Sequence, residues 1–209
     1  MTILTQPAHA MARIAVDQFC AADIDGFLHY WYASGPDALL RMGVDPARLP
    51  RPNKMREMLE WNLARDAASG QPQNAILSIK LDGETVGVHE LTHLVARGAA
   101  PGYASAIMHA HIWRAEHRGQ GIARVSYVLA MECFFARFGL DTIRFESPRD
   151  NPGAIGIKQK LGLRACGTGT IDLPILARPL PTVCYEVTRA ELAGLGARMR
   201  HATPENVPA

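Results

Sequence analysis

The chain has few cysteines, no long apolar run and almost no net charge, and each shortage excludes a class of protein. The four cysteines form no CxxC pair, so the sequence predicts buried, reduced thiols rather than disulfides or zinc ligands. No apolar stretch approaches the ~20 residues of a membrane-spanning helix. Residues 1–12 lack the charged and apolar regions of a signal peptide, which favours a cytoplasmic protein with no membrane partner.

Charge of either sign is nearly balanced, with 22 Lys and Arg against 20 Asp and Glu and a net charge of +2. This balance argues against a nucleic-acid partner. With 209 residues, of which 48% are hydrophobic, the chain is long enough to bury a sizeable core. We expect a single domain over residues 1–209, with residues 1–12 and 201–209 as flexible tails.

Hydrophobic periodicity and turn residues divide the chain into strands and helices. The segments expected as strands are Arg13–Phe19, Ala75–Leu81, Thr85–Leu94, Ala104–Trp113, Thr142–Glu146, Leu163–Thr170 and Thr182–Val187. Helices are expected after the caps Asp23 and Asn151, around Met55–Leu63, and over Ile122–Phe138 and Ala190–Arg200. Because hairpin connections are frequent and crossovers are confined to the middle, this order predicts an α+β fold with a mixed sheet.

A glycine-rich turn, residues 118–123 (Arg-Gly-Gln-Gly-Ile-Ala), lies between an expected strand and an expected helix. The first turn of a helix has unpaired N–H groups and a partial positive charge, and glycines let the backbone approach a ligand closely. The turn therefore predicts a phosphate-bearing ligand. It matches neither the P-loop nor the Rossmann fingerprint. An ordinary tight connection between strand and helix is the alternative.

A second motif follows, because Asn151-Pro152 opens a helix that ends at residues 160–163, Lys-Leu-Gly-Leu. Together with Arg118, Gly121 and Ala123, which match the pattern [Gln/Arg]-x-x-Gly-x-[Gly/Ala], it resembles the GNAT superfamily of N-acetyltransferases. The resemblance implies a mostly antiparallel central sheet of about seven strands with helices on both faces. It also implies acetyl-CoA as co-substrate and no metal.

The resemblance covers roughly residues 77–187 and is specific from 111 to 163. The strand Met108–Trp113 is similar to that of a bacterial subgroup with the pattern Met-His-x-His-x-Trp. In this family the backbone N–H groups after Arg118 hold the CoA pyrophosphate. The residues that would do so here are Gly119, Gln120, Gly121, Ile122, Ala123 and Arg124.

The same resemblance implies contacts for the rest of CoA. Ile112 and Trp113 would pair their backbone with the pantetheine arm, where the strand splays from its neighbour. Asn151 would hydrogen-bond the arm as well as capping its helix. Lys158 stands where many members have a tyrosine that donates to the CoA thiolate, so the lysine would stabilise that anion instead; an exposed helix lysine is the alternative. Tyr103 and Tyr127 are further candidates for the proton donor.

An amine must be neutral to attack a thioester, and at pH 7 only about one alkylamine in 2,500 is neutral, a cost of ~4.6 kcal/mol. A base with a pKa near 7 would help. His109 and His111 are two residues apart on a strand and share a face, as does a histidine pair in some members of the superfamily. Glu90 on the neighbouring strand is a candidate that would act through water. Alternatively, the histidines only fill the splayed strands and Glu90 is inert.

Tyr30 and Tyr32 are the candidates for binding the acceptor, because aromatic faces attract cations. The sequence thus predicts direct acetyl transfer to a primary amine of a small molecule or peptide N-terminus, and it leaves a homodimer open. One rival is a non-catalytic regulator that binds acyl-CoA. Another is a cupin-type metalloenzyme whose ligands would include His109, His111 and Glu116.

Overall fold

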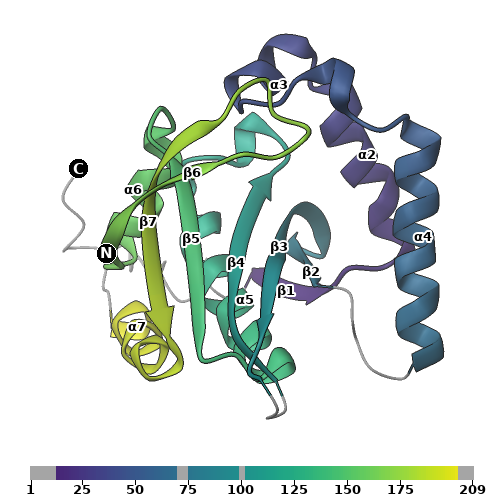
Figure 1. Cartoon of the computed structure of the whole chain (residues 1–209). Helices are drawn as coiled ribbons and strands as arrows, with labels where there is room; N and C mark the ends of the chain where they lie inside the picture. The colour runs from purple at the N-terminus through teal and green to yellow at the C-terminus, as the bar shows by residue number, and fades with distance from the viewer. Residues whose placement is uncertain (1–12, 70–74, 99–101, 202–209) are drawn as a thin grey trace, which may run out of the picture.

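A seven-stranded open sheet forms the centre of the computed structural model, which describes residues 13–69, 75–98 and 102–201 (Figure 1). The strands are β1 (Ile14–Gln18), β2 (Ile76–Leu81), β3 (Glu84–Ala96), β4 (Tyr103–Ile112), β5 (Thr142–Pro148), β6 (Arg164–Ile171) and β7 (Leu180–Thr188). Their order is β1-β2-β3-β4-β5-β7-β6, and only β4 and β5 pair in parallel. The expected mixed, mostly antiparallel α+β fold is confirmed.

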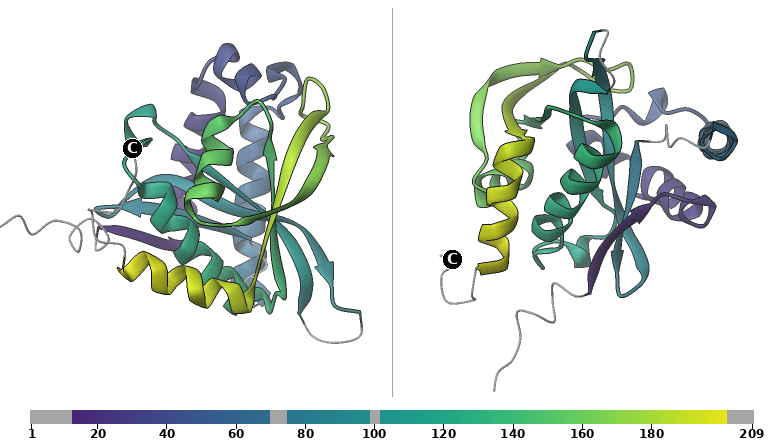
Figure 2. Two further views of the ribbon diagram at one scale, coloured as in Figure 1. Left: turned by 90° about the vertical axis from the view of Figure 1, so that its left-hand side faces the viewer. Right: turned by 90° about the horizontal axis from the view of Figure 1, so that it is seen from below.

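Helices cover both faces of the sheet (Figure 2). They are α2 (Ile24–Ala33), α3 (Pro36–Arg41), α4 (Pro52–Ser69), α5 (Ile122–Phe138), α6 (Pro152–Lys160) and α7 (Arg189–His201), with short 3-10 turns at η1 (Ala21–Asp23), η2 (Pro46–Arg48) and η3 (Ala115–His117). Helices α2 and α4 lie on one face, and α5 and α7 lie on the other. Helix α3 was not expected; it begins at Pro36, where proline suits the first helical position.

Alternation along the strands builds a separate apolar core on each face. The core beneath α5 contains Met131, Phe134 and Ile143, and the core beneath α2 contains Phe27 and Val88. Because helices cover both faces, the central strands are buried on both sides. A ligand can therefore reach the sheet only at the ends of the strands or at an open edge.

Strands β4 and β5 separate after a short contact. Their ladder runs only from Ser105 opposite Thr142 to Ile107 opposite Arg144, whereas β4 continues to Ile112 along β3. Within the described residues, the edge of β4 beyond Ile107 has no strand pairing on the β5 side. This is the splay that the sequence resemblance implies.

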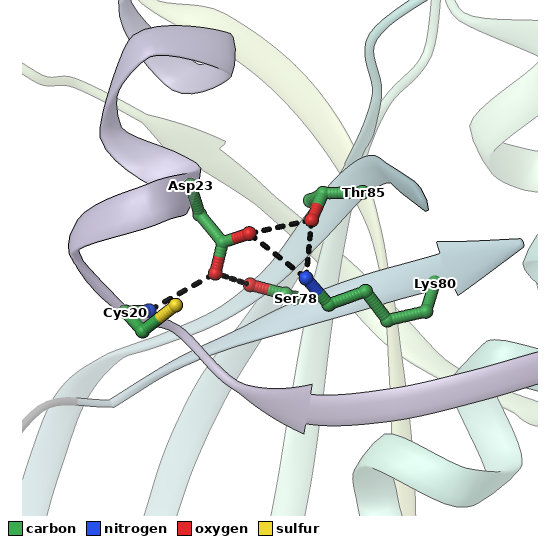
Figure 3. Close-up of polar contacts among 5 residues, drawn as sticks. All are labelled: Cys20, Asp23, Ser78, Lys80 and Thr85. Carbon is green, nitrogen blue, oxygen red and sulfur yellow. Dashed lines mark hydrogen bonds and ion pairs between the residues drawn. The ribbon is translucent and has the colours of Figure 1, made fainter. Parts of the chain in front are cut away.

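The start of α2 is anchored to the sheet by Asp23, whose carboxylate is almost fully buried (Figure 3). One carboxylate oxygen accepts from Ser78 Oγ at 2.6 Å and from the backbone N–H of Cys20 at 3.0 Å. The other contacts Thr85 Oγ1 and lies 3.0 Å from Lys80 Nζ. This cluster, Cys20–Asp23–Ser78–Lys80–Thr85, joins α2 to β2 and β3.

The expectation of buried cysteines is wrong for three of the four. Cys20, Cys133 and Cys166 are exposed and only Cys184 is buried, although all four are free thiols as predicted. At Cys20 and Cys133 the neighbours Phe19 and Phe134 are buried while the cysteines are exposed. Cys166 lies on β6, which is exposed along most of its length. Of the expected tails, residues 1–12 and 202–209 lie outside the described residues, and His201 is the last residue of α7. Among the described helices, none is both long and apolar enough to cross a membrane.

Candidate functional site

The glycine-rich turn ends at the N-terminus of α5, as the sequence predicts. Gly119 and Gly121 have φ angles of 76° and 77°, in the left-handed region that disfavours other residues. Gly121 is the N-cap, and within the described residues no side chain caps the first turn of α5. The N–H groups there are thus left for a ligand, and the residues Arg118, Gly119 and Gln120 are exposed.

The turn is tied to the end of β4. Arg118 donates from its guanidinium to the carbonyl oxygen of Ile112 at 3.2 Å, so the Ile112 carbonyl faces away from β3. Trp113 is different, because its backbone N–H donates to the Val86 carbonyl at 2.9 Å and therefore points toward β3. Its indole ring covers Gly26 of α2, where a Cβ would lie only 2.4 Å from a ring carbon. The backbone of Ile112 therefore points to the open side of β4, where a pantetheine arm is expected. The N–H of Trp113 is already bonded to β3.

On the α2 face of the sheet, Glu90, His109 and His111 lie together. Glu90 is directly opposite His109 in the ladder between β3 and β4, and Val88 is opposite His111. His109 is also the second residue after Ile107, so it lies just where β5 leaves β4. The structure therefore gathers the candidate catalytic residues at the splay.

The two acceptor-binding candidates separate. The Tyr30 hydroxyl lies 3.1 Å from His111 Nδ1, and the His111 ring packs against the rings of Tyr30 and Trp31. The Tyr32 hydroxyl instead donates to the Pro50 carbonyl at 2.6 Å, which ties α2 to the segment before α4. Tyr30 thus belongs to the cluster around His111, and Tyr32 does not.

Burial shifts the protonation of this cluster. It lowers the pKa of His109 to about 4, helped by the positive charges of Lys158 and His93, and it lowers the pKa of His111 to about 4, helped by His109 and Arg118. Both rings are therefore neutral at pH 7. Burial raises the pKa of Glu90 to about 7, so its carboxyl group is partly ionised at neutral pH.

Two polar side chains near His109 were not assigned to the catalytic site from the sequence. Thr92 Oγ1 lies 2.8 Å from His109 Nε2, and His93 Nδ1 lies 3.0 Å from the same Thr92 oxygen. His93 is exposed and has a φ of 51°, next to a break in the pairing register between Thr92 and Val95. The irregular strand places two consecutive side chains in mutual contact, which regular alternation would prevent.

Lys158 is buried, so the alternative of an exposed helix lysine is wrong. Its ammonium is 2.6 Å from the Tyr127 hydroxyl and lies over the rings of Tyr127 and Phe145. Burial lowers the pKa of Lys158 to about 7. Asn151 caps α6 as predicted, its Oδ1 accepting from the Ala154 N–H at 3.0 Å. Its amide nitrogen is a donor that this cap does not use.

Of the tyrosines that could replace the missing one, only Tyr127 contacts Lys158. Tyr103 begins β4 at the opposite end from Ile112 and packs against Phe138. Tyr127 lies on α5, and its ring contacts the rings of Phe145 on β5 and of the buried His89 on β3. Lys158, Tyr127 and His89 are therefore buried polar groups on the α5 face of the sheet, and His89 Nε2 lies 2.9 Å from Ser126 Oγ.

The cupin interpretation is wrong. The sheet is open and mixed rather than a closed barrel, and the long helix α5 packs against it. Glu116 is exposed in η3, away from the face that His109 and His111 share. In the described part of the chain, no three His, Cys, Asp or Glu residues are grouped to hold a metal ion.

Known proteins agree with this arrangement. Residues 13–164 match the family model described as Acetyltransferase (GNAT) domain. Spermidine N-acetyltransferase from Vibrio cholerae, solved with CoA and spermine, superposes with a TM-score of 0.66 at 15% identity, covering 87% of this chain and 99% of its own. Mycobacterium smegmatis RimJ, solved with CoA-disulfide, gives 0.66 at 18% identity, with 88% of each chain covered.

A third similar structure is the Microcin C7 self-immunity acetyltransferase MccE with acetyl-CoA and AMP, with a TM-score of 0.64, 11% identity and coverage of 84% of this chain and 92% of its own. No curated protein matches the chain. At these identities the solved structures establish the fold, whereas the family model matches most of the sequence. The chain belongs to the GNAT family of acetyltransferases and is an acyltransferase.

Proposed function

We propose that the protein transfers an acetyl group from acetyl-CoA directly to a primary amine. The observation that carries this proposal is the position of Glu90 and His109, directly opposite each other on β3 and β4 where β5 turns away. In this proposal the pyrophosphate occupies the N-terminus of α5, and the pantetheine arm follows the open edge of β4. The acceptor approaches from the α2 face.

The acceptor side supplies a carboxyl group and a neutral ring. Glu90, as carboxylate, attracts the ammonium form of the acceptor. His109 then accepts the proton that the amine loses as it attacks, since its pKa of about 4 keeps the ring unprotonated beforehand. His111, held by Tyr30 and Trp31, positions α2 against the site.

The donor side supplies a cation for the leaving group. As the C–S bond breaks, negative charge collects on the CoA sulfur, and the ammonium of Lys158 stabilises it. Tyr127 holds that ammonium at 2.6 Å. The amide nitrogen of Asn151 would bind the pantetheine arm. Acetyl passes straight to the amine, without an acyl-enzyme, so initial rates should follow a ternary-complex pattern.

The test measures CoA thiol release from acetyl-CoA against spermidine, amino acids, other small amines and peptides. We expect saturable turnover with at least one amine, and a large loss in His109→Ala. Micromolar binding of CoA with no turnover on any amine would instead favour the non-catalytic acyl-CoA-binding regulator. Turnover unchanged from pH 6 to 9 in both His109→Ala and His111→Ala would eliminate the histidine base.

Glu90 gives the proposal a pH signature. Its carboxylate is the active form, so kcat/KM should rise as the pH increases through about 7, the raised pKa of Glu90. Glu90→Gln should remove this rise and lower kcat/KM at pH 8 by about 10- to 100-fold. Glu84→Gln, at the exposed start of the same strand, is the control and should leave the profile unchanged. A Glu90→Gln profile that still rises near pH 7 would assign that step to another group.

A further inference from the structure

A continuous line of polar atoms connects the half-buried His109 with the exposed His93. His109 Nε2 is 2.8 Å from Thr92 Oγ1, and that oxygen is 3.0 Å from Nδ1 of the exposed His93. The arrangement depends on unusual backbone, because His93 has a φ of 51° beside the register break in β3. Histidine is tolerated there less well than glycine or asparagine, so the conformation has a local cost.

A hydroxyl between two imidazoles can bond both rings in two opposite directions, which differ in the tautomers of the rings. Threonine has one O–H hydrogen and two lone pairs, so its oxygen accepts from one ring and donates to the other. With Nε2–H of His109 donating to Thr92, the Thr92 hydroxyl donates to Nδ1 of His93. Nδ1 of His109 is then a lone pair, which is the form that can accept a proton from an amine.

The site needs a way to release that proton. Burial keeps the pKa of His109 near 4, so at pH 7 its imidazolium gives up a proton readily, and its Nε2 is already engaged by Thr92. Other charged or titratable groups near it are Glu90 opposite on β3, His111 on β4 and Lys158 from α6. Among the described residues, Thr92 is hydrogen-bonded both to His109 and to the exposed His93.

We propose that Thr92 and His93 form a proton relay that carries the amine proton from His109 to solvent. This inference rests on the proposed acetyl transfer. As Nδ1 of His109 takes the amine proton, its Nε2 proton moves to the Thr92 oxygen, the Thr92 proton moves to Nδ1 of His93, and His93 releases its Nε2 proton to water. Charge is conserved at each step. The resting tautomers return when Nδ1 of His109 gives its proton to the departing CoA thiolate, while His93 takes a proton from water at Nε2 and the relay passes one back through Thr92 to Nε2 of His109.

Thr92→Val tests the hydroxyl, because valine keeps the shape of threonine but cannot transfer a proton. We expect kcat to fall about tenfold or more, with the acceptor KM nearly unchanged. The ratio of kcat in H2O to kcat in D2O should rise, since proton removal becomes limiting. Thr92→Ser, which keeps the hydroxyl, should restore kcat to within about threefold of the parent chain.

His93→Asn tests the outer end, because asparagine tolerates a positive φ and so preserves the strand. We expect a lower kcat that added imidazole restores, with no such response in Thr92→Val. Should Thr92→Val fail to fold, this rescue experiment decides the matter alone. Normal kcat and isotope ratio in Thr92→Val, or a His93→Asn rate insensitive to imidazole, would overturn the relay while acetyl transfer by the parent chain stands. Absence of turnover in the parent chain would overturn both proposals.

Discussion

Lys158 is an amine buried between two aromatic rings, and its hydrogen-bond partner is a phenol rather than a carboxylate. It is 4% exposed, and in the described part of the chain no acidic side chain forms an ion pair with it. A buried ammonium without a counter-ion destabilises the fold. In the proposed mechanism the sulfur of the departing CoA is an anion beside this ammonium, and it would relieve that cost.

Lys158→Met should separate stability from catalysis. Methionine is similar in length and uncharged, so we expect an unchanged or higher melting temperature but a kcat lower by about 10- to 100-fold. In the parent chain the ammonium form is the active one, so kcat should fall as the pH rises through about 7, and Lys158→Met should lose this decline. Thermal unfolding and a pH profile of kcat provide the measurements.

Lys160→Met is the matched control for that variant, since Lys160 is exposed on the same helix. It should leave both stability and kcat unchanged. A Lys158→Met protein that melts earlier and keeps its kcat would show that Lys158 is structural, against the role proposed here. The rise from Glu90 belongs to the profile of kcat/KM and the decline from Lys158 to that of kcat, so the two effects are measured separately.

At the scale of elements, the placement of α2 depends on the cluster around Asp23 (Figure 3). Burial alone would raise the pKa of Asp23, but hydrogen bonds from Ser78, Thr85, Cys20 and Lys80 outweigh it and lower the pKa to about 2. The carboxylate is therefore stabilised in the folded chain. Its contribution is complete above the unfolded pKa of about 4 and is lost as the pH falls toward 2.

Asp23→Ala should reduce the free energy of unfolding by about 3 kcal/mol at pH 7, because it leaves Lys80 and Ser78 without their partner. The loss should shrink as the pH is lowered from 5 toward 2, as urea unfolding at several pH values will show. Asp25→Ala is the control: its ion pair with Arg56 is exposed, so its effect should stay within about 0.5 kcal/mol. Equal losses for the two variants would contradict a special role for Asp23.

Some features of the elements and of the site follow from local sequence patterns, and others do not. The left-handed φ at Gly119 and Gly121 and the cap at Asn151 follow from local residue preferences, and the structure has both. The contact of His93 with Thr92 arises from a break in strand pairing, and the burial of Lys158 arises from the packing of α6 on β5 and α5. Both depend on tertiary contacts that no local pattern encodes.

At the scale of the molecule, two segments that are distant in the sequence meet beyond the C-terminal ends of β4 and β5 (Figure 1). We define the clasp as residues 43–45 and 175–177, which lie before η2 and between β6 and β7 (Figure 1). The N–H of Asp45 donates to Ile175, the N–H of Ala177 donates to Gly43, and Val44 bridges to Leu176. The side chains of Val44 and Leu176 are buried together with Leu39 and Leu180.

The clasp adjoins the acceptor side of the proposed site. Met42, next to the clasp, accepts a hydrogen bond from the Tyr30 hydroxyl through its sulfur at 3.1 Å, and Tyr30 contacts His111. The CoA side depends instead on α5 and the open edge of β4. Disturbing the clasp should therefore affect the acceptor more than the donor.

Leu176→Asp places a carboxylate in the apolar side of the clasp and should open it. We expect the KM for the acceptor to rise about tenfold through the shift of Tyr30, while the Kd for CoA stays within about twofold. Steady-state kinetics and calorimetry measure the two quantities. Arg178→Ala, which removes only an exposed ion pair with Asp150 beside the clasp, should change neither. If Leu176→Asp weakens CoA binding and leaves the acceptor KM unaltered, the clasp supports the donor side, and the acceptor does not approach from the α2 face as proposed.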